Sequence, residues 1–126
     1  SLDNRLLYRN LTMHKNLLEI IVSDERPGEI IVKLKGEVDQ LTVKNLKKIL
    51  EEHKAEDACE LIFDLDEVEF MASAGLAIFA YYKELFNKKK ADQRLRVINC
   101  SPGVYRIFHL TMLDEMLEVQ QKSEEF

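Results

Sequence analysis

The sequence predicts one α/β domain, built on a mixed β-sheet with an N-terminal hairpin, parallel inner strands and packed α-helices. Two strand-like segments near the N-terminus are joined by a short turn, and the later strand-like segments alternate with segments of helical periodicity. Strands separated by helices become parallel neighbours through right-handed crossovers. The chain has 126 residues with only 4 glycines and 2 prolines, a size and composition typical of a single domain without linkers.

The N-terminal part is expected to contain an extension, residues 1–16, whose structure its mixed pattern leaves open, followed by a β-hairpin. The first strand of the hairpin covers 17–22, and the segment DERPGE at 24–29 supplies a turn through its proline and glycine. The second strand runs over 30–39, with alternate apolar residues on one buried face and a break near Gly36. Adjacent strands joined by a short turn pair as a hairpin.

The middle of the chain predicts a helix, a strand and a second helix. Asp39 or Thr42 can cap the first helix. Its apolar residues recur at helical spacing: Val43, Leu46, Ile49, Leu50 and His53. A short apolar strand, CELIFDL, follows at 59–65. The run FMASAGLAIFAYY at 70–82 then begins a second helix that continues to about Asn87.

The C-terminal part predicts a strand, a third helix and a closing strand. The strand RLRVINC covers 94–100, and Ser101 followed by Pro102 is typical of a helix start. The apolar stripe of this helix consists of Val104, Ile107 and Phe108. The segment MLEVQ at 116–120 closes the sheet, so the expected order is β-β-α-β-α-β-α-β.

One edge of the predicted sheet gathers the polar residues that follow the strands. In parallel α/β sheets the loops after the carboxyl ends of the strands lie together, and binding sites form there. Asp39, Ser73 and Ser101 all fall on these loops or at the helix starts next to them. This edge is therefore where we expect the functional site.

Composition and charge exclude several classes of partner. The formal net charge is -5 and no lysine- or arginine-rich face is evident, which argues against nucleic acid as a partner. No run approaches the ~18 consecutive apolar residues of a membrane-spanning helix, so no membrane partner is expected. Cys59 and Cys100 each lie beside a strand-like segment, without a CxxC motif or a signal peptide. They indicate reduced thiols and a cytoplasmic location.

The residues of catalytic sites are missing or badly spaced. The histidines are far apart, with neither HExxH nor a Cys/His cluster: His14, His53 and His109. The sequence ASAG around Ser73 lacks the first glycine of the GxSxG elbow of hydrolases. Asp64 and Asp66 lie at the end of a buried strand, as a phosphoryl acceptor would, but the metal-binding acidic pair before a helix and the lysine of such a site are lacking. We expect no catalytic residues, no metal and no cofactor.

Ser73 is the one serine at the start of an otherwise apolar helix. Its structural interpretation is an N-cap, which satisfies a free N–H group of the first turn. The first half of that helix is almost entirely apolar: Ala72, Ala74, Leu76, Ala77, Ile78, Phe79 and Ala80. Either these turns are buried all round, or they present an apolar surface beside a hydroxyl, as a partner-binding surface would.

Three segments of the sequence resemble a known family. They are GEVD at 36–39, LIFDLDEVEFMASAGL at 61–76 and SPGVYRIFHLTML at 101–113. They are similar to the anti-sigma factor antagonists, which are single STAS domains, and the spacing agrees from about Leu17 to Gln120. The resemblance implies the STAS fold, with the STAS domain covering 17–126 after the extension.

The resemblance also implies a switch. In the family the usual motif is Asp-Ser-Ser-Gly or Asp-Ser-Thr-Gly, and its first hydroxyl is phosphorylated by an anti-sigma factor that is also a serine kinase. Ser73 matches this hydroxyl, while Ala72 and Ala74 replace the motif aspartate and the second hydroxyl. The unmodified antagonist binds the anti-sigma factor and frees the sigma factor. The implied partner-binding residues are Asp39, Ala72, Ser73, Ala74, Gly75 and Leu76.

The resulting hypothesis is a regulatory protein-binding module without enzyme activity. Its implied partner is an anti-sigma factor, a serine kinase of the histidine-kinase-like ATPase fold, and the module itself is expected to be a monomer or a weak dimer. One alternative is a STAS scaffold that is not phosphorylated. Another is a small cytosolic α/β domain that binds a ligand or catalyses a reaction at the same edge. Phosphate on Ser73 separates the first two, and incubation with small metabolites tests the third.

Overall fold

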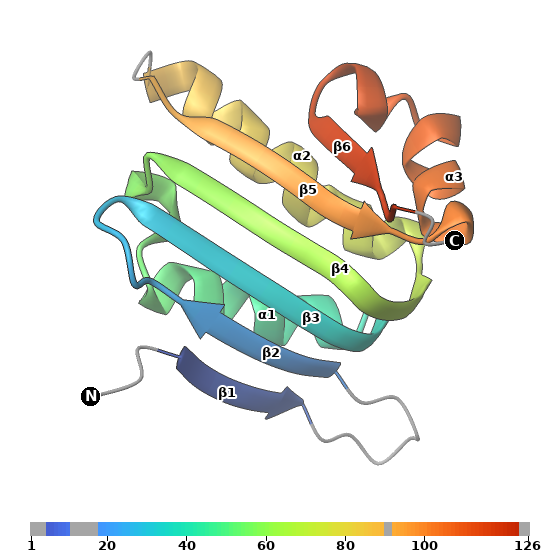
Figure 1. The fold of residues 1–126 in the computed structure, drawn as a ribbon, viewed down its shortest axis with the longest axis horizontal. Coiled ribbons are helices and arrows are strands. Elements are labelled where there is room, and N and C mark those ends of the chain that lie inside the picture. The colour runs from blue at the N-terminus through green and yellow to red at the C-terminus, as the bar shows by residue number, and fades with distance from the viewer. Residues whose placement is uncertain (1–4, 11–17, 90–91, 124–126) are drawn as a thin grey trace.

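A computed structural model of the chain describes residues 5–10, 18–89 and 92–123 and contains one six-stranded mixed sheet (Figure 1). The strands are β1 (Arg5–Asn10), β2 (Leu18–Ser23), β3 (Glu29–Val38), β4 (Glu60–Met71), β5 (Arg94–Cys100) and β6 (Glu118–Gln121). The helices are α1 (Thr42–Glu52), α2 (Ser73–Lys89) and α3 (Pro102–Leu110), with 3-10 turns at Ala55–Asp57 and Leu113–Glu115. The α/β prediction and the predicted order of elements after residue 17 are confirmed.

The N-terminal hairpin forms as predicted. Strands β2 and β3 are antiparallel, and the turn between them contains Gly28 at a φ of +78°, a backbone conformation that suits glycine. The predicted break near Gly36 is present as a shift in the pairing of β3 with β4, with a φ of +116° at that glycine. Within the N-terminal extension, Arg5–Asn10 forms β1 and pairs antiparallel with β2 at the edge of the sheet.

Strand β4 is longer than predicted. The expected strand ended at 65, but β4 continues through the acidic segment to Met71 and pairs in parallel with β3. Leu65, Val68 and Met71 are buried three residues apart, because shifts in the β3–β4 register interrupt the alternation of faces. Strands β3, β4 and β5 are the parallel inner strands that the sequence predicts, and the edge strand β6 is parallel to β5.

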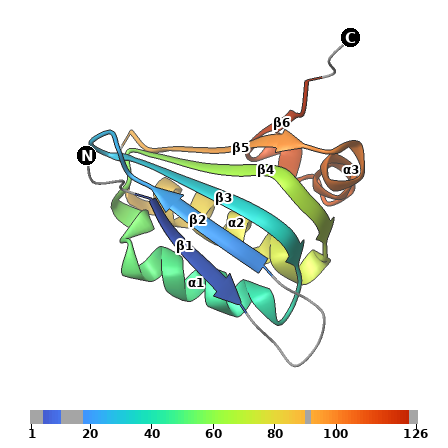
Figure 2. The same cartoon turned by 60° about the horizontal axis from the view of Figure 1, so that its bottom comes forward.

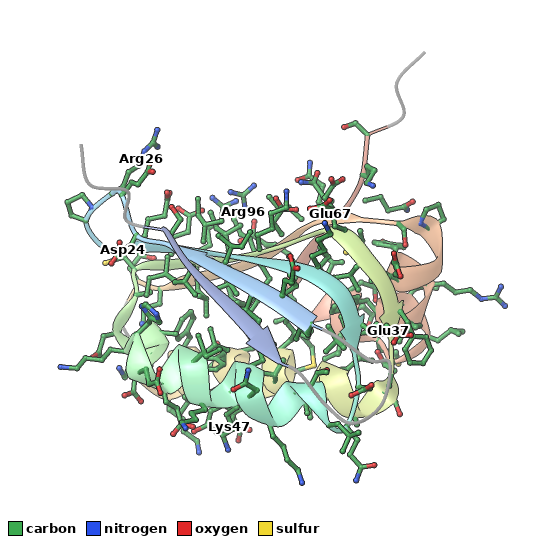
Figure 3. The ribbon with its side chains drawn as sticks, turned by 90° about the horizontal axis from the view of Figure 1, so that it is seen from below. Asp24, Arg26, Glu37, Lys47, Glu67 and Arg96 are labelled. Carbon is green, nitrogen blue, oxygen red and sulfur yellow. The ribbon has the colours of Figure 1, made fainter. Side chains whose placement is uncertain are left out.

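Helices α1 and α2 lie side by side on one face of the sheet, and the core lies between them and the strands (Figure 2). Phe63 of β4 contacts Phe79 of α2 edge-on, with ring centroids 4.9 Å apart, and Phe79 in turn contacts Phe108 of α3 at 5.3 Å. Figure 3 shows Arg96 and Glu67 on the opposite side of the sheet from the helices, whereas Lys47 lies on the helical side. The face of the sheet away from α1 and α2 therefore carries charged side chains.

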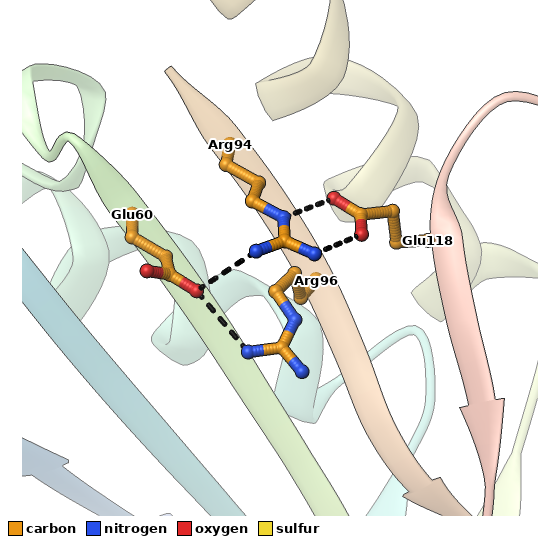
Figure 4. Close-up of polar contacts among 4 residues, drawn as sticks. All are labelled: Glu60, Arg94, Arg96 and Glu118. Atoms are coloured by element: carbon orange, nitrogen blue, oxygen red, sulfur yellow. Dashed lines mark hydrogen bonds and ion pairs between the residues drawn. The ribbon is translucent and has the colours of Figure 1, made fainter. Parts of the chain in front are cut away.

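Ion pairs on this face connect strands β4, β5 and β6 (Figure 4). Arg94 of β5 donates from Nε to Glu118 of β6 at 2.6 Å, and Arg96 pairs with Glu60 of β4 at 3.1 Å. Hydrogen bonding with Arg94 lowers the pKa of Glu118. Each pair is partly exposed and contributes little by itself. Only the Arg94–Glu118 pair involves β6, a strand of four residues, and joins it to β5.

The start of α3 agrees with the sequence. The Ser101 hydroxyl accepts a hydrogen bond from the Val104 N–H at 3.2 Å, and Pro102 is the first helical residue. Ser101 is thus a structural cap. Among the residues that the structure describes, no helix is both long enough and apolar enough to cross a membrane.

Candidate functional site

The structure brings Asp39 and Ser73 to one place because β3 and β4 end side by side. Val38 and Met71, the last residues of the two strands, are register partners. The Ala72 N–H donates to the Val38 carbonyl at 2.8 Å, which holds the start of α2 against the end of β3. The residues at and after the ends of the two strands therefore share the predicted edge, which we call the β3–β4 edge: Phe70 of β4, and Asp39, Leu41, Ala72, Ser73 and Ala74 after the strands.

Asp39 caps helix α1 from three residues before its first residue. Its Oδ1 accepts hydrogen bonds from the Leu41 and Thr42 N–H groups, both at 2.9 Å. Thr42 reciprocates, since its hydroxyl accepts from the Asp39 N–H at 2.9 Å and donates to the Glu37 carbonyl at 3.0 Å. The two capping residues that the sequence offered as alternatives act together. Asp39 is half-buried. It therefore holds the start of α1 in position and also lies on the β3–β4 edge.

Ser73 is exposed and is the first residue of α2, with Ala72 before it. The prediction that Ser73 is the N-cap is wrong by one residue, because Ala72 holds that position. Within residues 5–10, 18–89 and 92–123 the Ser73 hydroxyl makes no hydrogen bond. The hydroxyl lies at the helix end where free N–H groups and the helix dipole favour an anion.

Gly75 and Leu76 are buried, although the resemblance places them among the contact residues. A Cβ on Gly75 would lie 2.7 Å from Val38 Cγ1 and 3.1 Å from Met71 Sδ, so only glycine lets α2 pack this closely on the strand ends. Leu76 is 4% exposed and belongs to the hydrophobic core. The prediction that the Leu76 side chain contacts a partner is wrong: its side chain faces the sheet. Ala74, by contrast, is exposed as expected.

Three large apolar side chains at or near the β3–β4 edge are exposed, and sequence reasoning missed them. They are Leu41 at 47%, Phe70 at 49% and Tyr81 at 43% exposure. Ala74, Ala77 and Tyr81 follow one another at helical spacing along the exposed side of α2. That spacing was visible in the sequence as a stripe separate from the buried residues of α2. These side chains add exposed apolar area to the strand ends and to α2.

The remaining candidates for chemistry lie apart from Ser73. His109 contacts Asp114 Oδ2 through Nδ1 at 2.8 Å at the end of α3, and His14 lies outside the described residues. Burial raises the pKa of the Cys100 thiol to about 12, so it is protonated at neutral pH. In the described part of the chain no cluster of histidine, cysteine and carboxylate residues has the arrangement of a metal site.

Replacing Ala72 by aspartate should stabilise the protein by about 0.5–2 kcal/mol, the usual difference between a good N-cap and alanine. The carboxylate would accept hydrogen bonds from the first turn of α2, which has no acidic residue of its own. Urea unfolding measures the change. Ala77→Asp, on the exposed side of the second turn, is the matched control and should be neutral or destabilising. Equal or lower stability of Ala72→Asp would show that Ala72 is not in the N-cap position.

Comparisons with known proteins agree with this geometry. The sequence model described as the STAS domain matches residues 21–126. The chain is 27% identical over 104 residues to the anti-sigma-B factor antagonist of Listeria monocytogenes, covering 82% of this chain and 89% of that protein. It is 28% identical over 93 residues to the anti-sigma-B factor antagonist of Staphylococcus aureus, covering 74% of this chain and 84% of that protein.

A solved structure gives the same result in three dimensions. The crystal structure of an anti-sigma factor antagonist from Mycobacterium paratuberculosis superposes with a TM-score of 0.70 and is 30% identical in sequence. The match covers 82% of this chain and 85% of the other. The similarity therefore extends over most of both proteins and includes the segment that carries the β3–β4 edge.

Proposed function

The chain belongs to the STAS domain family, and from this membership we propose that it is an anti-sigma factor antagonist whose β3–β4 edge binds an anti-sigma factor. The observation that carries the proposal is the exposed, unbonded Ser73 hydroxyl at the start of α2, beside exposed apolar side chains. Phe70 and Leu41 supply apolar area of the kind found at the centre of protein interfaces. Ser73 supplies a hydroxyl whose modification can prevent a partner from binding to that area.

Phosphorylation of Ser73 is the proposed switch. A phosphate adds about -1.5 to -2 charges and three acceptor oxygens. Within this fold it lies at a helix N-terminus, where the dipole favours an anion, so the fold tolerates it. Against an apolar partner surface the same phosphate loses its hydration, which is costly. The modification therefore blocks binding without disturbing the domain.

The proposed partner is an anti-sigma factor that is also a serine kinase of the histidine-kinase-like ATPase fold. This partner binds ATP and transfers its γ-phosphoryl group to the Ser73 hydroxyl, with ADP as the leaving group, while the antagonist supplies only the acceptor hydroxyl and the docking surface. The proposal places both proteins in the bacterial cytoplasm, with the antagonist as a monomer or weak dimer.

A scaffold that is never phosphorylated is the second candidate. The observation that favours it is Ala72, which stands where the family motif has a carboxylate next to the hydroxyl. Without that carboxylate a kinase loses one group by which it could recognise the serine. The binding surface itself is the same in both candidates.

Titration of the purified chain with the serine-kinase anti-sigma factors of its own genome tests the proposal. We expect one of them to bind the unmodified chain and, with ATP, to place phosphate on Ser73 alone, mapped by mass spectrometry. Ser73→Ala removes the phosphate but not the binding. Absence of binding to any of them contradicts the antagonist role, and phosphate on Ser101 alone contradicts the switch. Binding without phosphate selects the scaffold.

A further inference from the structure

We propose that the groove between α1 and α2 receives an acidic amphipathic helix of the partner. This inference rests on the proposed function, because the groove begins next to Ser73, and it specifies the chemistry of the partner's contact segment. The groove has a volume of about 320 Å³ and lies on the face of α1 and α2 away from the sheet. Its lining consists of Val43, Lys44, Lys47, Ala74, Ala77, Ile78 and Tyr81.

The floor of the groove is apolar, and the side chains along its α2 side are short. Ile78 is buried beneath it, and the exposed residues of α2 at this point are Ala74 and Ala77, whose short side chains let another backbone approach. Tyr81 forms one end and is 43% exposed. A volume of this size is at the lower limit of ligand pockets, roughly 300–1,000 Å³, and suits a few apolar side chains better than a cofactor.

The rim of the groove is positive. Lys44 and Lys47 of α1 line it, and none of the lining residues is acidic. The Lys47 Nζ lies 4.9 Å from the centre of the Tyr81 ring, and neither lysine forms an ion pair with another residue in the described ranges. On a chain whose net charge is -5, this is a local positive site whose two lysines form no ion pair within the described residues. Carboxylates complement it.

A helix is the element that fits. Both walls are helices whose backbone groups are bonded internally, so a partner strand would find no sheet edge to pair with here. A helix satisfies its own backbone and offers apolar side chains at i, i+3, i+4 and i+7, with charged residues beside them. We therefore assign the groove an amphipathic helix that inserts apolar side chains over Ala77 and directs carboxylates to Lys44 and Lys47.

This arrangement gives the switch a second physical cause. Ala74 lines the groove and directly follows Ser73, so a phosphate on Ser73 is carried by the residue next to the lining. The phosphate and the carboxylates of the helix carry charge of the same sign. Their repulsion adds to the desolvation cost of the phosphate, and it weakens with added salt.

Charge reversal on the rim tests the inference, with the anti-sigma factor that binds the unmodified chain as the probe. Lys44→Glu/Lys47→Glu should weaken binding about tenfold or more and abolish its decrease with salt, because like charges across an interface repel. Lys48→Glu is the matched control: it is exposed on the same helix but outside the groove, and binding should change less than about twofold. Circular dichroism and thermal unfolding verify that each variant is folded.

A second variant tests the apolar floor without changing charge. Ala77→Trp fills the groove and should also weaken binding about tenfold or more, whereas Asn87→Trp, exposed at the other end of α2, should not. If the anti-sigma factor binds the wild-type chain but all four variants bind equally well, the groove is not the docking site and the antagonist role stands. If no anti-sigma factor binds the wild-type chain, the proposed function fails first.

Discussion

Phosphate on Ser73 should lower the affinity of the chain for its anti-sigma factor by about a hundredfold or more. Removing the hydration of an unpaired charge in an interface costs several kcal/mol, and each 1.4 kcal/mol is a factor of ten in affinity. The structure supplies both halves of this effect. Ser73 is exposed at the helix start, and large apolar side chains at the same edge, Leu41 and Phe70, are exposed with it.

The free energy of unfolding should stay the same or rise slightly when Ser73 carries phosphate. An anion in the first turn of a helix is favourable by about 0.3–1 kcal/mol, and no acidic residue lies in the first turn of α2 to repel it. A modification that blocked binding by unfolding α2 would instead lower stability. Measuring both quantities on the same sample therefore separates a local switch from a structural one.

Isothermal titration calorimetry of the phosphorylated and unmodified chains measures the affinity, and urea unfolding measures the stability. Ser73→Glu carries part of the charge and should reproduce part of the loss. Gln120→Glu, exposed on β6, adds the same charge elsewhere and serves as the control. An affinity that does not change when Ser73 is fully phosphorylated would contradict the switch.

The order of strands and helices was predictable because each element carries its own period. Alternation in 30–39 and helical spacing after Asp39 identify β3 and α1 without any tertiary information. The full length of β4 was not predictable in this way. It contains four acidic residues between 64 and 69, and its pairing with β3 shifts register, so the buried residues no longer alternate. Tertiary pairing, not local pattern, makes that segment a strand.

The position of the candidate site in the fold was predictable from the sequence, but the directions of its side chains were not. The resemblance identifies Ser73 and the residues around it, yet a motif does not say which of them face the core. Alanine adds to the difficulty, since Ala74 and Ala77 carry no polar group to distinguish an exposed position from a buried one. The predicted N-cap of α2 differs from the observed position by one residue because alanine also marks no helix start. Helix boundaries shift by a residue or two unless a capping side chain fixes them, and Ala72 is a poor cap.

Replacing Leu76 by glutamate should destabilise the domain by about 4 kcal/mol or more, because a carboxylate without a partner would be buried. Leu76 is 4% exposed and packs in the core, on the same side of α2 as Phe79. The loss is comparable to the whole stability of many small domains, roughly 5–15 kcal/mol. We expect the variant to be partly unfolded at room temperature, and its loss of binding would follow from that.

Ala74→Glu provides the contrast that separates core from surface within one turn of α2. Ala74 is exposed and close to the helix N-terminus, where a carboxylate is favourable, so stability should change by less than about 0.5 kcal/mol. Binding should nevertheless fall, because the new charge lies in the lining of the groove between α1 and α2.

Urea unfolding and titration with the anti-sigma factor measure both variants side by side. Wild-type stability in Leu76→Glu, with binding lost, would put Leu76 on the surface and contradict the packing of α2. The expected pattern, in which Leu76→Glu loses the fold and Ala74→Glu loses only the partner, follows from which side of the helix faces the sheet.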